Sequence, residues 1–369
     1  MRLREVAAVF LKLGATAFGG PAAAIGLMQD EVVERRRWID RQTFLDLLGA
    51  TNLVPGPNST ELAIHLGYVR AGWPGLIVAG VCFIVPAMVM VLALAWAYVR
   101  FGALPQVGWL LYGIKPVIVA VVGQALWSLT RTAVKDWTTG LVGAAVLGGV
   151  LLGLGEVPML IVAGLLVMCV RNRVGAAAAA PFWAIGLAAA PAVTAPSLGG
   201  LALFFLKVGS VLYGSGYVLL AFLQGDLVER YGWLTSQQLL DAVAVGQFTP
   251  GPLFTTATFV GYLLGGWQGG VIATVAIFLP AFLFVAVSGP LLPRLRKSPW
   301  MAGFLDGVNA ASLGLMGAVT LMLGRAALVD WQTVLLSLAA LGALLRYRKL
   351  NSAWLVVAGG VIGWLLKWI

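Results

Sequence analysis

Residues 52–73 read NLVPGPNSTELAIHLGYVRAGW, and residues 244–262 read AVGQFTPGPLFTTATFVGY. Each stretch places a Pro-Gly-Pro triplet, at 55–57 and 250–252, inside otherwise apolar sequence and follows it with hydroxyl side chains and a Gly-Tyr pair. Because proline and glycine end helices and permit sharp reversals, each triplet predicts a break within an apolar helix. The two similar stretches indicate an internal duplication.

The duplication extends far beyond the triplets. A shift of 195 residues places Lys12 on Lys207, together with the Phe-Leu that precedes each lysine. One residue is missing from the second copy after the triplet, and a shift of 194 then places Asp136-Trp137 on Asp330-Trp331. Duplicated halves are a recurring plan of secondary transporters.

The composition is that of a membrane protein. Of the 369 residues, 60% are hydrophobic and only 10% are charged, whereas soluble proteins carry about a quarter charged residues. The net charge of +10 is explained by Lys and Arg in cytoplasmic loops, and without a basic stripe it does not indicate nucleic-acid binding. A single histidine and two cysteines in apolar runs predict neither a metal site nor a cofactor.

The sequence therefore predicts an all-α membrane protein with six apolar segments in each half. The domains are an N-terminal repeat at 1–173, a linker transmembrane helix at 174–196 and a C-terminal repeat at 197–369. The first-half segments are 4–28, 42–69, 74–99, 105–130, 138–153 and 157–170. The second-half segments are 200–223, 237–263, 268–291, 299–324, 331–345 and 352–366.

Loop charges predict that the second repeat is inverted relative to the first. Positive charges cluster in the loops 131–135, 292–298 and 346–349, whereas the equivalent loops of the other repeat carry few or none. Under the positive-inside rule this pattern places the N-terminus in the cytoplasm and the C-terminus outside the inner membrane. The uncharged linker at 174–196 then crosses the bilayer; an Ala/Pro-rich linker in water is the alternative.

The loop at 35–41 holds four arginines and belongs on the cytoplasmic side with the N-terminus. This placement requires the first two segments to enter the membrane and return, as re-entrant hairpins broken at Phe18-Gly19-Gly20-Pro21 and at Pro55-Gly56-Pro57. The alternative is that both segments span with a kink and leave the arginine-rich loop outside.

Broken helices bring unpaired backbone N–H groups and the positive end of a helix dipole to the membrane midplane, where they suit an anion. Hydroxyls and an amide at the same helix starts add donors, although ordinary helix capping would use the same residue types. The predicted substrate-binding residues are Gly19, Gly20, Gly56, Asn58, Ser59, Thr60, Gly214, Ser215, Gly251, Thr255 and Thr256, with Lys12 and Lys207.

Lys12 and Lys207 occupy equivalent places within apolar segments, where a lysine is costly and indicates function. Two such lysines would supply two positive charges to a dianion, unless each side chain reaches the membrane surface instead. Lys115 also lies within an apolar segment, but its counterpart is Asn309. Glu61 and His65, one helical turn apart, are candidates for proton coupling or for a mutually satisfied pair.

The stretches FGGP at 18–21, EVVERRRW at 31–38, GSVLYGSGYVLLAFL at 209–223 and the two that contain Pro-Gly-Pro resemble the chromate ion transporter family, in its long two-domain form. The resemblance covers essentially the whole chain. It implies transport of chromate, a tetrahedral dianion, energised by the proton motive force and directed outward. Many members of the family have histidine where this chain has Ala24.

The sequence thus predicts a secondary active transporter of chromate, and not an enzyme, because it offers no nucleophile–base set or metal ligands. Sulfate or another tetrahedral oxyanion remains an alternative substrate, and an anion channel remains an alternative mechanism. The sequence does not distinguish a monomer from a homodimer.

Overall fold

The structure, a computed structural model, describes residues 2–172, 195–213, 216–288, 298–347 and 350–368. Every regular element within these ranges is helical, in agreement with the predicted all-α class. The predicted linker helix at 174–196 lies outside the described residues except for its last two positions. Gly214 and Ser215, predicted to bind substrate, also lie outside them.

The first half contains α1 (Arg2–Thr16), α2 (Gly20–Gln29), the π-helical η1 (Asp30–Arg35), α3 (Arg41–Thr51), α4 (Asn58–Phe101), α5 (Pro105–Ala133), α6 (Trp137–Leu151) and α7 (Glu156–Arg171). The second half contains α8 (Leu198–Val211), η3 (Gly216–Val218), α9 (Leu219–Phe222), the π-helical η4 (Leu223–Arg230), α10 (Ser236–Phe248), η5 (Leu253–Thr255), α11 (Thr256–Ser288), α13 (Pro299–Ala327), α14 (Trp331–Arg346) and α15 (Ser352–Trp368). Within the described residues, four helices are long and apolar enough to cross a membrane: α4, α5, α11 together with η5, and α13.

The helices are broken at the motifs where the sequence predicts breaks. α3 ends at Thr51 before the first Pro-Gly-Pro triplet and α4 begins after it, and the second triplet separates α10 from η5 in the same way. Gly56 and Gly251, the central residues of the triplets, have φ of 144° and 99°. Such backbone angles are strained for any residue with a Cβ, so glycine is required at both turns.

Local geometry repeats between the halves at the sequence shift of 194. α4 is kinked at Ala71 (φ −143°, ψ 20°) and Gly72 (φ 63°, ψ −153°). α11 is kinked at Gly265 (φ −146°, ψ 24°) and Gly266 (φ 61°, ψ −156°). The agreement of these angles within a few degrees means that the kinks are specified by the repeated sequence.

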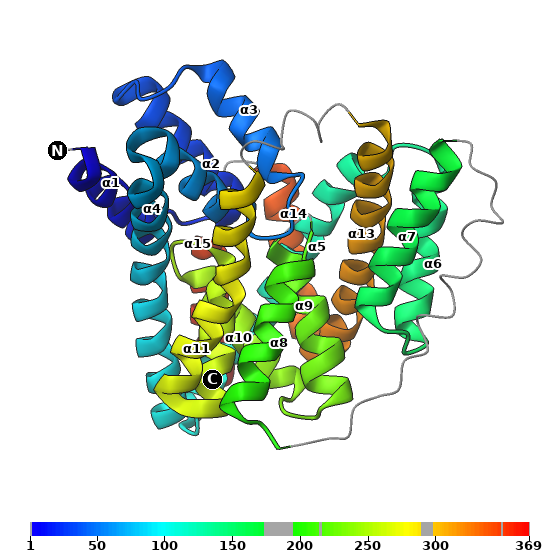
Figure 1. The fold of residues 1–369 in the computed structure, drawn as a ribbon. Helices are drawn as coiled ribbons and strands as arrows, with labels where there is room; N and C mark the ends of the chain where they lie inside the picture. The colour runs from blue at the N-terminus through cyan, green and yellow to red at the C-terminus, as the bar shows by residue number, and fades with distance from the viewer. Residues whose placement is uncertain (1, 173–194, 214–215, 289–297, 348–349, 369) are drawn as a thin grey trace.

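The hairpins of the two halves lie at opposite ends of the molecule (Figure 1). α1, α2 and α3 gather near the N-terminus at the upper end of the view, whereas α8, α9 and α10 lie toward the lower end, where α15 finishes. α7 ends at the upper side and α8 begins at the lower side. The second half therefore starts from the face opposite to the one on which the first half starts.

The later helices interlock the two halves. α13 of the second half packs against α6 and α7 of the first, while α5 of the first half packs against α14 and α15 of the second. α4 and α11 also pack side by side. Because each half supplies packing partners to the other, the later helices of the two repeats share one core.

The hydrophobic core is divided unequally between the hairpins. Buried residues of α8, α9 and α10 belong to one large cluster that also includes α5, α6, α7 and α13. The first-half hairpins form a smaller cluster of their own with the start of α4, centred on Phe10, Phe44 and Phe83. The second-half hairpins are thus embedded in the molecule more completely than those of the first half.

Candidate functional site

Two equivalent hydrogen bonds join the four helix breaks in pairs, each pair made of one break from each half. The Gly56 N–H donates to the carbonyl oxygen of Leu212, at 2.8 Å, and the Gly251 N–H donates to the carbonyl oxygen of Ala17, at 3.1 Å. Both donors and both acceptors are related by the sequence shift of 195. Each Pro-Gly-Pro turn is therefore attached to the broken first helix of the opposite half.

A cavity of about 450 Å³ lies beside the first of these turns. Its walls come from the break before α4, from the end of α5, from η3 and from the middle of α13. The lining residues are Asn52, Val54, Asn58, Leu129, Thr132, Ala133, Lys135, Val218, Asn309, Ser312 and Leu313. The volume is ample for a tetrahedral oxyanion with part of its hydration shell.

The polar part of this lining consists of amides, hydroxyls and an ammonium group. Asn58 Nδ2 donates to Asn52 Oδ1 at 2.7 Å, which orients both amides, and Ser312 Oγ donates to the Tyr213 carbonyl at 3.3 Å. Amide N–H and ammonium groups are donors, and no carboxylate occurs among the described lining residues. The chemistry of the wall therefore suits an anion rather than a cation.

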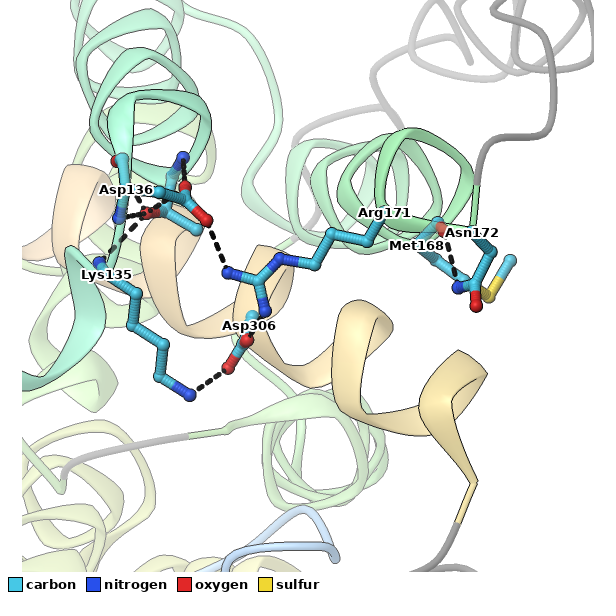
Figure 2. Close-up of polar contacts among 7 residues, drawn as sticks. Lys135, Asp136, Met168, Arg171, Asn172 and Asp306 are labelled. Carbon is cyan, nitrogen blue, oxygen red and sulfur yellow. Dashed lines mark hydrogen bonds and ion pairs between the residues drawn. The ribbon is translucent and has the colours of Figure 1, made fainter.

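Lys135 is held at the cavity by an ion-pair network that joins α5, α6, α7 and α13 (Figure 2). Its Nζ lies 2.7 Å from Asp306 Oδ1, and Arg171 contacts Asp306 and also Asp136, the latter at 2.6 Å. Hydrogen bonds from Thr139 and from the Arg171 guanidinium lower the pKa of Asp136 to about 2. Asp136 is therefore ionised at every physiological pH, and Arg171 bridges two acids while Lys135 pairs with one.

Of the residues that the sequence analysis assigned to substrate binding, Asn58 lines the cavity. Ser59 and Thr60 follow it into the buried interior. The hydroxyls of Thr255 and Thr256 donate to the Pro252 and Leu253 carbonyls, at 2.8 and 2.9 Å, so their protons are directed back to the turn that precedes them.

The predicted glycines within the described residues lie at the turns, and some of their backbone N–H groups donate to protein carbonyls. The N–H groups of Gly56 and Gly251 are those that bind the opposite half. Gly19 and Gly20 form the α1–α2 turn with φ of 104° and 76°. Donation from these glycines to a substrate remains a prediction.

Lys12 and Lys207 lie away from the cavity and form equivalent ion pairs. Lys12 Nζ is 3.3 Å from Glu31 Oε2, and Lys207 pairs with Asp226, the residue related to Glu31 by the shift of 195. The Lys12 side chain is 55% exposed, which is the geometry expected of a lysine that reaches toward the surface. Their predicted role as charges for the substrate stays untested.

Glu61 and His65 lie deeper than the cavity, on the first turns of α4. Glu61 is fully buried, and no described residue donates a hydrogen bond to either carboxyl oxygen. His65 is 4% exposed, and its Nε2 has no hydrogen-bond partner among the described residues. The two side chains are therefore not a mutually satisfied pair.

Sequence reasoning missed most of the cavity wall, because Asn52, Thr132 and Ser312 are ordinary residues for helix ends and interiors. Lys135 was assigned only to a charged loop. One signal was present: Asn309 is an amide within an apolar helix at the place of Lys115 in the other half. A position that holds different polar residues in the two repeats indicates that the two halves differ in function there.

Comparison with known proteins identifies the family. A family model described as chromate transporter matches residues 4–170 and again residues 199–364. The chain is 36% identical to a chromate transport protein of Cupriavidus metallidurans, over 98% of this chain and 92% of the relative. It is 34% identical to a probable chromate transport protein of Synechococcus elongatus, over 98% and 95%, and to a chromate transport protein of Pseudomonas aeruginosa, over 99% and 93%.

No solved structure matches the chain. The relatives are named as transport proteins, not as enzymes, and their similarity covers nearly the full length of the chain. The apolar helices agree with a multi-pass membrane protein. On this evidence the chain is a member of the chromate transporter family.

Proposed function

We propose that this protein exports chromate across the inner membrane by exposing the cavity alternately to the two sides. The observation that carries the proposal is the cavity itself, which combines neutral donors with Lys135 beside the turn where the halves are joined. Chromate is a tetrahedral dianion with four acceptor oxygens, so amide, hydroxyl and ammonium donors complement it.

The proposed architecture is a pair of inverted repeats whose first two segments are re-entrant hairpins. Three observations support it: the family model matches the chain twice, the kink angles recur, and the hairpins of the two halves lie at opposite ends. Inverted repeats place a substrate site at the repeat interface and allow one half to adopt the arrangement of the other. The end of α5 lines the cavity, and this end of the helix lies toward the same side of the molecule as the N-terminus (Figure 1), which positive loops assign to the cytoplasm.

The charge of the substrate favours export. Moving one elementary charge across a potential of 100 mV is worth about 2.3 kcal/mol, so the exit of a dianion from a negative interior gains roughly twice this amount. Proton entry in exchange would add the pH gradient to the driving force. We assign proton binding to Glu61 and His65, one and two turns beyond Asn58, because both are buried and no described residue bonds the Glu61 carboxyl oxygens or His65 Nε2.

Transport into inside-out vesicles tests the proposal and its rivals together. Purified protein should accumulate chromate against its gradient when a pH gradient is imposed, and excess sulfate should compete only weakly. Equal competition by sulfate would assign the site to tetrahedral dianions in general. Flux that dissipates a chromate gradient without any response to the pH gradient would instead indicate a channel.

The Asn309→Asp variant is expected to lose chromate transport. Asn309 lines the cavity, so the variant places a fixed negative charge beside the bound dianion. At an effective dielectric constant of about 20, such repulsion amounts to several kcal/mol, enough to reduce flux at least a hundredfold. The neutral Asn309→Gln variant is the control, and wild-type flux in Asn309→Asp would exclude the cavity as the substrate site.

The Asp306→Asn variant is expected to bind chromate more tightly. It removes the acid that pairs with Lys135 at 2.7 Å and leaves the ammonium free to face the cavity. Attraction between the freed, partly exposed ammonium group and chromate is worth about 1 kcal/mol, which lowers the apparent KM about fivefold. The variant should also lose thermal stability, because Arg171 loses one partner. The measurement is chromate uptake as a function of concentration, and Asp306→Glu, which retains the charge, serves as control.

A further inference from the structure

A second polar cluster fastens α10 to α4, α5 and α13. Lys115 Nζ of α5 is 3.0 Å from Asp241 Oδ1 of α10, and Tyr98 of α4 donates to Asp241 Oδ2 at 2.8 Å. Lys115 also donates to Gln237 Oε1 at 2.7 Å, and Gln237 Nε2 donates to the Ala326 carbonyl of α13 at 2.6 Å. Asp241 is 3% exposed.

The same positions in the first half have a different arrangement. Gln42 and Asp46 of α3 correspond to Gln237 and Asp241 by the shift of 195. Both are exposed, and Gln42 donates to Asp46 within α3 at 3.4 Å. The residue that corresponds to Lys115, Asn309, faces the cavity instead of a helix.

Packing of the whole helices shows the same difference. α10 packs against α5, α13 and α15, and most of its residues from Leu239 to Gln247 are buried. α3 makes its principal contacts with α4 and buries Phe44, Ala50 and Thr51. Two segments of repeated sequence therefore occupy two states in one molecule: α10 is docked, whereas α3 is withdrawn and leaves the cavity beside it.

We propose that Lys115, Asp241, Tyr98 and Gln237 form the extracytoplasmic gate of the transporter, closed in this structure, and that α3 is the corresponding cytoplasmic gate, which is open. This inference rests on the proposed alternating access. In the opposite state α3 docks against α13 and α5, with Asp46 directed toward Asn309 and Gln42 toward the Thr132 carbonyl, while α10 withdraws. Inverted repeats exchange conformations in this way because their related sequences support both arrangements of the same segments.

The two gates are unequal in charge. The closed gate has an ion pair that is also hydrogen-bonded to a tyrosine, whereas the cytoplasmic gate opposes Asp46 to the neutral amide of Asn309. Closing the extracytoplasmic side therefore gains a contact that closing the cytoplasmic side lacks. The substrate-free protein accordingly rests open to the cytoplasm, where chromate is collected for export.

Thiol accessibility at a matched pair of leucines tests this assignment. Leu129 lines the cavity, and Leu323, related to it by the shift of 194, is 1% exposed. Each is replaced by cysteine in a protein whose native Cys82 and Cys169 are changed to serine, and a membrane-impermeant maleimide is applied to vesicles of each orientation. We expect Leu129→Cys to react from the cytoplasmic side and Leu323→Cys to be protected.

Adding Lys115→Asn, which installs the residue present in the other half, should raise the labelling rate of Leu323→Cys roughly tenfold and lower that of Leu129→Cys. The exchange Lys115→Asp with Asp241→Lys should restore protection of Leu323→Cys. A variant that merely unfolds exposes both cysteines, whereas gate opening moves the two rates in opposite directions. Unchanged labelling of Leu323→Cys in a protein that still transports chromate would overturn the gate assignment and leave the proposed function standing.

Discussion

Chromate transport by the Glu61→Gln variant is expected to become independent of the pH gradient while exchange of chromate at equal pH continues. Glu61 is the fully buried carboxyl group on the first turn of α4, one turn beyond Asn58 on the same face of the helix. Its Oε1 packs so closely against the Gly56 turn that a Cβ at that glycine would lie 2.3 Å away. Glu61 is therefore in close contact with the turn whose Gly56 N–H binds the Leu212 carbonyl of the second half.

The surroundings of Glu61 favour a proton-carrying carboxyl in this conformation. An ionised carboxylate buried without donors costs several kcal/mol, and the described residues supply none to either oxygen. Release of the proton then requires water or a donor to reach the group, which the opposite state would provide. Glutamine reproduces the shape and neutrality of the protonated side chain but cannot release a proton. The variant therefore retains the transport steps in which Glu61 is protonated and loses those in which it is ionised.

Chromate counterflow at symmetrical pH and uptake driven by an imposed pH gradient are the two measurements. Glu61→Gln should retain at least about a third of wild-type counterflow and lose more than about 90% of the uptake driven by the pH gradient. A coupling residue is needed for gradient-driven uptake but not for counterflow. Glu34→Gln, the same change at an exposed position, is the control. Full stimulation of Glu61→Gln by the pH gradient would assign coupling to another group.

The sequence was sufficient to predict the helical class, the duplication and the positions of the breaks, because each depends on local features: apolar length, proline and glycine placement, and matching letters. It could not predict how the halves interlock. The packing of α13 against α6 and α7, and of α5 against α14 and α15, depends on contacts between residues far apart in the chain. No local sequence pattern predicts the π-helical segments η1 and η4 either.

The candidate site shows the same limit in chemical terms. The role predicted for Lys12 and Lys207 as charges for the substrate stays a prediction. Each lysine meets an acid nineteen residues later, and that distance along the chain carries no periodic signal. Lys135 appeared to be a loop charge but reaches the cavity through its bond to Asp306, a residue of α13. The sequence shows which charges are costly to leave unpaired, whereas their partners are found only in three dimensions.

The Gly67→Val variant is expected to lose most folded protein, because Gly67 lies where α4 turns back and packs against itself across its kink. A Cβ at Gly67 would lie 2.3 Å from the Gly75 carbonyl oxygen, and one at Gly75 would lie 2.2 Å from the Gly67 carbonyl oxygen. Both neighbours are backbone atoms that cannot rotate away. Gly261 and Gly269 of α11 show the same mutual contact, with 2.3 and 2.2 Å.

Overpacking of this kind costs about 1–3 kcal/mol for a single methyl group and more for a branched side chain. The cost of Gly67→Val therefore takes a large part of the total of roughly 5–15 kcal/mol that stabilises a folded protein. Size-exclusion profiles and thermal unfolding in detergent measure the effect. Gly148→Val is the matched control, since a Cβ at Gly148 meets no atom within 4 Å. Equal yields and equal Tm for the two variants would mean that α4 does not pack against itself at this kink.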